Sequence, residues 1–261
     1  MYPFWLEIDA FELGPFELGP FNAPTFGPMV VLGFLAAYWV LKKEFIRKSI
    51  DPELASSILT AGIVGGLVGA KLYFAMFEVP DGVGLAGMMS ALFSGSGLTW
   101  YGGFVLATVS IVWVVKRRGV PFLVVADAGG MGLAIGYGIG RIGCQLAGDG
   151  DYGIPTDLPW GMAYPPPAVV PTFEKVHPTP VYETLAGAAT FGMLWLLRTK
   201  LATPGILFSL YLILAGGARF LVEFIRQKQI VVFGLTDAQW ISLLLIATGV
   251  TLVLYLRRER P

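Results

Sequence analysis

The chain has 261 residues, of which 55% are hydrophobic and only 14% are charged. Soluble domains carry about 25% charged residues, and a mean hydropathy of +0.69 places this chain among integral membrane proteins. A net charge of zero gives no indication of a nucleic-acid partner. A single cysteine and a single histidine exclude a disulfide framework and a Cys/His zinc site, and we expect no metal or cofactor.

The apolar segments predict an all-α, polytopic membrane protein. A spanning helix needs about 20 mostly apolar residues, and seven segments meet this requirement. They cover residues 26–42, 53–77, 98–116, 121–146, 179–198, 204–226 and 236–256. A shorter apolar segment, residues 83–93, is predicted to lie at the membrane interface.

Lysine and arginine residues indicate the orientation of these spans. Basic clusters follow the first, third, fifth and seventh spans, so an odd number of crossings brings them all to one face. The clusters comprise Lys42, Lys43, Arg47, Lys48, Lys116, Arg117, Arg118, Arg198, Lys200, Arg257, Arg258 and Arg260. The positive-inside rule makes this face cytoplasmic. The N-terminus is therefore predicted outside, and residues 257–261 form a cytoplasmic tail.

Two segments outside the spans are too long to be simple turns. Residues 1–25 contain the tandem Phe11–Pro15 and Phe16–Pro20, each reading Phe-Glu-Leu-Gly-Pro. Mixed aromatic and acidic residues favour an arm lying at the interface, and a disordered acidic tail is the alternative. Residues 147–178 are rich in Asp, Pro, Gly and Trp, which predicts a small irregular head on the outer face. This head belongs to a membrane domain that covers residues 26–256.

Five charged side chains lie inside predicted spans, where a central charge costs about 2.5–3.5 kcal/mol. They are Lys71, Arg141, Glu183, Arg219 and Glu223. All five fall in the outer half of the membrane. Snorkelling or a helix-locking ion pair would explain one such residue, but convergence from four helices favours a polar, functional cavity. Asp127, at the inner end of the fourth span, is predicted to be an interfacial residue instead.

The arginines in this group point to an anionic ligand. Arg219 and Glu223 are four residues apart and share one helix face, which Arg226 extends toward the outer surface. Arg141 has no acidic residue within a turn on its own helix, so it needs a partner from elsewhere or a bound anion. The planar guanidinium group suits phosphate because it donates two parallel hydrogen bonds.

Glycine spacing predicts closely packed helices. Residues 138–143 match G-x-G-x-x-G, but the motif ends an apolar span and lacks the strand that dinucleotide binding requires. Small residues four apart permit close approach of helices in lipid. They are Gly132, Gly136 and Gly140 in the fourth span, and Gly62, Gly66, Gly69 and Ala70 in the second. At the start of the fifth span, Thr179 suits an N-cap and Pro180 the first helical position.

Several motifs together resemble the prolipoprotein diacylglyceryl transferase family. They are Tyr101-Gly102-Gly103, Gly140-Arg141-Ile142-Gly143-Cys144 with Gly148-Asp149, His177-Pro178-Thr179-Pro180-Val181-Tyr182-Glu183, Arg219 to Arg226, and Gly234-Leu235-Thr236 with Gln239. The resemblance extends from about residue 26 to residue 250, and it depends on the joint order of these motifs along a seven-span chain.

The resemblance implies a transferase of the bacterial inner membrane with its active site toward the periplasmic face. Members transfer the diacylglyceryl group of phosphatidylglycerol to the lipobox cysteine thiol of a prolipoprotein, forming a thioether and releasing glycerol phosphate. Arginines at headgroup depth would stabilise the charge that develops on the leaving phosphate. The alternatives are a phospholipid-binding or phospholipid-moving relative without transferase activity, and an ion-coupled transporter, although the two matching halves typical of transporters are not evident.

The resemblance also implies the site residues. Arg141 and Arg219 would bind the phosphate, while Asp149 stands at the family's acidic position. The base that deprotonates the thiol stays open between Asp149, Tyr101 and water. Further substrate-binding positions are Lys71, Gly102, Gly103, Cys144, Gly153, His177, Tyr182, Glu183, Glu223 and Arg226. Because the reacting thiol belongs to the substrate, Cys144 is not expected to be a nucleophile.

The chain departs from the family pattern at four positions. Tyr101 stands where some members have a proposed histidine base, and Cys144 where asparagine is frequent. Phe26 and Ala215 each replace a functional tyrosine. The segment ending at Gly153 is one residue longer than the usual form. Tyrosine is a poor base at its ordinary pKa of about 10, so these changes leave room for a different acceptor.

Overall fold

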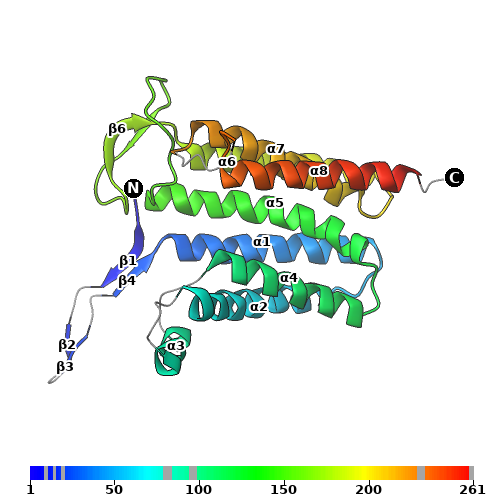
Figure 1. Cartoon of the computed structure of the whole chain (residues 1–261), viewed down its shortest axis with the longest axis horizontal. Coiled ribbons are helices and arrows are strands. Elements are labelled where there is room, and N and C mark those ends of the chain that lie inside the picture. The colour runs from blue at the N-terminus through cyan, green and yellow to red at the C-terminus, as the bar shows by residue number, and fades with distance from the viewer. Residues whose placement is uncertain are drawn as a thin grey trace. The chain divides into compact units, whose positions relative to one another are not determined.

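The computed structural model describes residues 1–8, 11–13, 16–18, 21–78, 84–93, 99–227 and 233–258. These residues are mostly helical (Figure 1). The α-helices are α1 (Phe26–Arg47), α2 (Glu53–Phe77), α3 (Gly84–Phe93), α4 (Trp100–Arg117), α5 (Phe122–Ala147), α6 (Thr179–Leu197), α7 (Ile206–Val222) and α8 (Asp237–Arg258). A 3₁₀ turn, η1 (Glu223–Ile225), directly extends α7.

Each of the seven predicted spans coincides with a long helix, and their ends differ from the expected ones by a few residues. In the described part of the chain, four helical segments are long and apolar enough to cross a membrane. They are Glu53–Phe77, Phe122–Ala147, Ile206–Ile225 and Asp237–Arg258. These helices fit a multi-pass membrane protein. The short apolar segment expected at 83–93 corresponds to α3, which begins at Gly84.

The all-α prediction overlooked three short antiparallel sheets. Strand β1 (Phe4–Ile8) pairs with β4 (Phe21–Pro24), β2 (Phe11–Leu13) with β3 (Phe16–Leu18), and β5 (Met162–Tyr164) with β6 (Thr172–Val176). In the β2–β3 pair, the two Phe-Glu-Leu repeats lie opposite each other, with Glu12 facing Glu17. Alternating apolar and polar residues suit a strand, which explains why the arm forms paired strands.

The chain divides into two compact units. Unit 1 comprises Met1–Val40 and Ala126–Pro261, and unit 2 comprises Leu41–Val125. Unit 1 contains a buried core formed by Val40, Met131, Leu194 and Leu207. The N-terminal residues and the segment with β5 and β6 lie at the same end of this unit (Figure 1), where the Tyr2 amide donates to the Leu146 carbonyl oxygen over 2.9 Å.

Glycines allow helices to pack closely within each unit. In unit 2, a Cβ atom added to Gly65 would lie 2.9 Å from the Leu106 carbonyl oxygen, so α2 and α4 approach backbone to backbone. In unit 1, a Cβ on Gly136 would lie 3.4 Å from the Gly33 carbonyl oxygen of α1. Among the described residues, no atom lies within 4 Å of a Cβ added to Gly140. The predicted close packing is therefore present at Gly136 but absent at Gly140.

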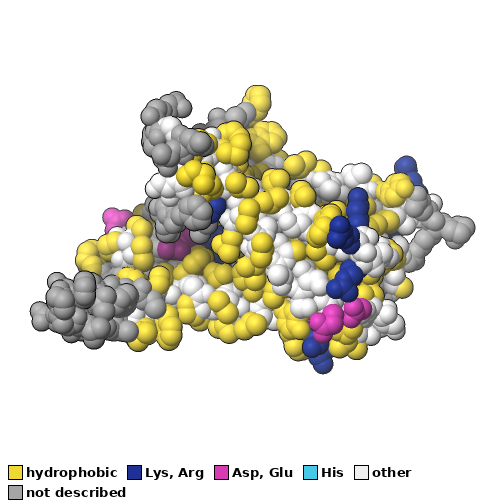
Figure 2. Space-filling model, turned by 90° about the horizontal axis from the view of Figure 1, so that it is seen from below, with side chains coloured by type: hydrophobic (Ala, Val, Ile, Leu, Met, Phe, Trp, Pro, Cys, Tyr) yellow, Lys and Arg dark blue, Asp and Glu magenta, His cyan; other side chains and the backbone are white. Residues whose placement is uncertain are grey.

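Large apolar side chains remain exposed along the helices. Leu185, Leu196, Leu221 and Leu244 are each more than 60% exposed, and hydrophobic side chains cover much of the face in Figure 2. A soluble monomer rarely exposes contiguous apolar patches of more than a few hundred Å². Contact with lipid explains this surface.

Asp127 is buried within the protein, near the start of α5, and its predicted place at the membrane interface stays a prediction. Its side chain accepts hydrogen bonds from the backbone amides of Gly205 at 3.0 Å and Phe208 at 2.9 Å, and the residue is 2% exposed. The first amides of a helix have no partner within that helix, and a carboxylate both accepts from them and favours the positive end of the helix dipole. Sequence spacing did not reveal this role because the partner amides lie 78 and 81 residues away along the chain.

The close α2–α4 packing predicts opposite effects for two neighbouring glycines. A Cβ on Gly69 would lie 2.6 Å from the Leu106 Cβ and even closer to the Gly102 carbonyl oxygen, whereas one on Gly66 would be 3.9 Å from the Ala107 Cβ. Gly69→Ala should therefore destabilise the protein by about 1–3 kcal/mol. Gly66→Ala should be neutral or slightly stabilising, because alanine favours helix more than glycine. Thermal unfolding in detergent measures both, and equal effects would contradict the packing argument.

Candidate functional site

Six charged side chains from separate segments of unit 1 form one connected network. They are Arg141 on α5, Asp151 in the following loop, Glu183 on α6, Arg219 on α7, Glu223 in η1 and Arg226 directly after it. Three positive and three negative charges make the network formally neutral. Such balance is what allows charges to be buried together.

Glu183 is the centre of this network. Its carboxylate lies 3.4 Å from Arg141 Nε, 3.6 Å from Arg219 Nη1 and 3.4 Å from Arg226 Nη1. The Tyr137 hydroxyl donates a hydrogen bond of 2.5 Å to the same carboxylate. The Glu183 side chain is only 2% exposed. A buried carboxylate is stable only with such partners, so Glu183 fixes the three arginines relative to one another.

Asp151 bridges two of these arginines. Its Oδ2 atom contacts Arg141 Nη1, and its Oδ1 atom contacts Arg226 Nη2. The Thr179 hydroxyl donates to the Asp151 carbonyl oxygen, and Asp149 Oδ1 accepts the Asp151 amide proton over 3.2 Å. Partial burial raises the pKa of Asp151, but the two guanidinium groups outweigh burial and hold this pKa below its ordinary value.

Arg219 and Glu223 meet on one helix face, as their spacing predicts. Arg219 Nη2 lies 2.8 Å from Glu223 Oε2, and Arg226 Nε lies 4.0 Å from the same oxygen. These are charge contacts, because neither Glu223 Oε2 nor Arg219 Nη1 makes a well-directed hydrogen bond within the described residues. Buried groups of this kind retain hydrogen-bonding capacity for a ligand.

The structure thus brings together most of the charged residues predicted for the site. Sequence reasoning missed Asp151 and Tyr137. It placed the acidic role at Asp149, which forms no ion pair with the network in the described part of the chain. Asp149 and Asp151, the two Asp residues of the Asp/Gly run that follows α5, cannot be told apart by spacing. Of these two, the fold brings Asp151 into contact with the arginines.

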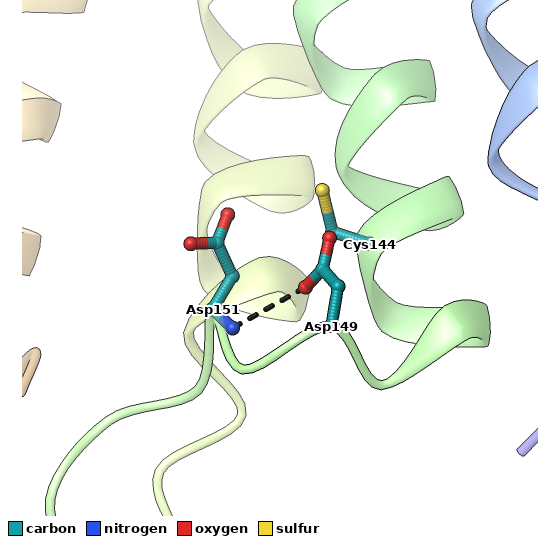
Figure 3. Close-up of side chains that lie close together, drawn as sticks. All are labelled: Cys144, Asp149 and Asp151. Atoms are coloured by element: carbon teal, nitrogen blue, oxygen red, sulfur yellow. Dashed lines mark hydrogen bonds between the residues drawn. The ribbon is translucent and has the colours of Figure 1, made fainter. Parts of the chain in front are cut away.

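Cys144 is buried beside these loop carboxylates. The Cys144 Sγ atom and the carboxylates of Asp149 and Asp151 lie within 4.8 Å of one another, and Figure 3 shows Asp149 next to Cys144. This set of atoms is a poor metal site, because two guanidinium groups already contact Asp151 and would repel a cation. Arg141 Nη1 also lies 4.0 Å from the sulfur atom.

His177 lies at the end of the head, and within the described residues its side chain makes no hydrogen bond or ion pair with the three arginines. Its Nδ1 atom lies 3.3 Å from the Tyr182 hydroxyl, which also accepts a 2.8 Å hydrogen bond from Trp160 Nε1. The His177 carbonyl oxygen accepts the Gly153 amide proton over 2.8 Å. A Cβ atom on Gly153 would collide with the Ile225 carbonyl oxygen, so only glycine allows the loop to pack against η1. Thr179, expected to be the N-cap, is the first residue of α6, and Pro178 is the N-cap.

Four other predicted site residues, Lys71, Tyr101, Gly102 and Gly103, belong to unit 2. Gly102 and Gly103 face α2, where added Cβ atoms would meet the backbone of Gly69 and of Gly66. Tyr101 is 56% exposed. The two glycines therefore have a packing role. The catalytic role of Tyr101 and the substrate-binding roles of Lys71, Gly102 and Gly103 stay predictions.

The lowered pKa of Asp151 predicts a pH-dependent contribution to stability. This contribution is complete above the unfolded pKa of about 3.9 and is lost as the pH falls through the folded pKa. Asp151→Asn should thus reduce stability at pH 7 by about 1–3 kcal/mol, and the deficit should shrink below about pH 4. Asp157→Asn, at an exposed position in the same head, is the control. A deficit that does not change with pH in thermal unfolding would contradict the ion-pair explanation.

Comparisons with known proteins agree with the site. Residues 14–255 match the family model described as prolipoprotein diacylglyceryl transferase. A phosphatidylglycerol–prolipoprotein diacylglyceryl transferase of Leptospira interrogans is 34% identical, covering 82% of this chain and 74% of its own. Relatives of the same name from Clostridium tetani and Methylobacillus flagellatus are each 32% identical, covering 86% and 89% of this chain and 90% and 92% of their own. The chain therefore belongs to the prolipoprotein diacylglyceryl transferase family.

Proposed function

We propose that this protein transfers the diacylglyceryl group of phosphatidylglycerol to a prolipoprotein. The sulfur of the substrate's lipobox cysteine attacks the glyceryl carbon that carries the phosphate. A C–S bond forms, the C–O bond to phosphate breaks, and glycerol phosphate leaves. The observation that carries this proposal is the gathering of three arginines from α5, α7 and the end of η1 around one buried carboxylate, in a chain of this family.

The arginines suit an anionic lipid headgroup. Arg141 and Arg226 direct guanidinium groups toward the same point, where Asp151 contacts both of them. Arg219 Nη1 is buried and retains hydrogen-bonding capacity. As the C–O bond breaks, negative charge grows on the phosphate, and prearranged guanidinium groups stabilise that charge without reorganising. Glu183 and Glu223 position the arginines for this task.

The base that accepts the thiol proton stays open between Asp149, Tyr101 and water. Free cysteine has a pKa near 8.5, so the positive field of the arginines would itself favour the thiolate. Cys144 is a lining residue and not a nucleophile, because it is buried on α5 and the substrate supplies the reacting sulfur.

The proposed topology has seven spans, an outer N-terminus and a cytoplasmic C-terminus. Arg141 and Arg219 lie toward the ends of α5 and α7, while basic clusters follow α1, α4, α6 and α8. The site then lies in the outer leaflet of the bacterial inner membrane. The head at 147–178 and the arm at 1–25 face the periplasm.

One assay tests the transferase directly. Purified full-length protein is mixed with phosphatidylglycerol and a peptide containing a lipobox cysteine, and both glycerol phosphate release and the peptide mass are followed. The expected result is stoichiometric release and a diacylglyceryl mass increase on the peptide. Phospholipid binding without release would point instead to a non-catalytic relative.

Arg141 provides the sharpest test of phosphate recognition. Arg141→Lys keeps the positive charge but removes the planar fork that contacts Asp151 and Glu183. Activity should fall about 10²–10³-fold, as when one oxyanion-stabilising donor is removed. Arg258→Lys, exposed at the end of α8, is the matched control. Normal turnover in Arg141→Ala would refute the assignment.

His177 is predicted not to be the general base. Its ring contacts Tyr182 in the head and makes no contact with the arginine network among the described residues. His177→Gln should retain at least about a tenth of the activity, whereas loss of a general base typically costs about 10²–10⁴-fold. The pH–rate profile should keep its acidic limb. A thousandfold loss with that limb abolished, in a folded variant, would identify His177 as the base.

A further inference from the structure

The position of Asp151 matches the position that a phosphate group would need. Its two carboxylate oxygens contact one guanidinium group each, on Arg141 and on Arg226. Two oxygens of a phosphodiester bind arginine side chains in the same way. We infer that Asp151 and the donor phosphate compete for these two arginines, so that Asp151 leaves when the lipid binds and returns when the product departs. This inference rests on the proposed transferase function.

Asp151 differs from the other two acidic residues of the network in its exposure and in the loop that carries it. Its side chain is 29% exposed, whereas those of Glu183 and Glu223 are 2% and 8% exposed. It lies in a loop after Gly148 and Gly150, whose φ angles are +61° and +91°. Glu183, in contrast, projects from helix α6 and is held by Tyr137. An exchange of partners would therefore involve the loop and leave the helices in place.

Charge balance also favours an exchange over simple addition. The three arginines are neutralised by three carboxylates. A phosphodiester adds one negative charge, and leaving all three carboxylates in place would give the partly buried network an excess anion, which is unfavourable. If Asp151 moves to solvent as the phosphate enters, the network remains neutral. Asp151 is the only one of the three acids with substantial exposure.

The exchange would assist product release. Glycerol phosphate is a phosphate monoester and carries about −1.5 to −2 charges at pH 7, so it should bind the arginines more strongly than the diester from which it came. Returning Asp151 competes directly for the guanidinium groups that hold the product. Asp151 is thus a positioning residue that acts through Arg141 and Arg226 and need not touch the reacting carbon.

The test compares Asp151→Asn with the control Asp157→Asn in purified full-length protein. Asparagine has nearly the same shape but lacks the charge, so it competes poorly for arginine. Glycerol phosphate should bind Asp151→Asn about tenfold more tightly by calorimetry, the equivalent of about 1.4 kcal/mol. In turnover, KM for phosphatidylglycerol and kcat should both fall, with stronger inhibition by glycerol phosphate. Asp157→Asn should match the wild-type protein.

Unchanged or weaker glycerol phosphate binding in Asp151→Asn would overturn the exchange. Asp151→Ser is a second variant that lacks the charge and has a smaller side chain. Failure of both variants to fold would also overturn the proposal, because a residue that leaves its position in each cycle cannot be required for folding. A wild-type protein without turnover, but with tighter binding in Asp151→Asn, would refute the transferase and leave the exchange standing. Normal turnover without tighter binding would refute the exchange alone.

Discussion

The burial of one carboxylate organises the site. Glu183 is almost inaccessible to solvent, and its charge is tolerable only because Arg141, Arg219 and Arg226 surround it. Those arginines come from three separate segments, so all three segments must be in place for Glu183 to have its full set of partners. Because burying the Glu183 charge without cationic partners would be unfavourable, this one residue on α6 fixes how the three arginines are arranged. A second acid, Asp151, connects that site to the head.

Close packing makes this arrangement possible in lipid. Apolar helices gain little from burying apolar surface when the solvent is itself apolar, so they associate through van der Waals contact and polar interactions. Gly187 on α6 provides such contact, because a Cβ atom there would lie 3.1 Å from the Ala134 carbonyl oxygen of α5. On α5 the contact at Ala134 precedes Arg141, and on α6 the contact at Gly187 follows Glu183. It brings their backbones close enough for the two side chains to meet.

The helices and most of the charged cluster could be predicted from the sequence, because apolar length and misplaced charges are local signals. Arg219 and Glu223 pair through helix periodicity alone. The role of Asp151 could not be predicted, since it depends on how a glycine-containing loop turns after α5. Tyr137 was missed because a tyrosine in an apolar span resembles any aromatic core residue. The sheet of β5 and β6 escaped notice because its strands are short and lie between prolines and glycines.

The cap formed by Asp127 joins the start of α7 to a fixed position near the start of α5. Asp127 on α5 binds the Gly205 amide at the start of α7. Arg141 follows Asp127 by fourteen residues, and Arg219 follows Gly205 by the same number. At 1.5 Å per residue, both arginines therefore stand about 21 Å from the cap. Because both arginines lie at the same distance along their helices from the shared cap, they reach the same level of the helix bundle. The common level of Arg141 and Arg219 is thus set by an interaction at the opposite end of their helices.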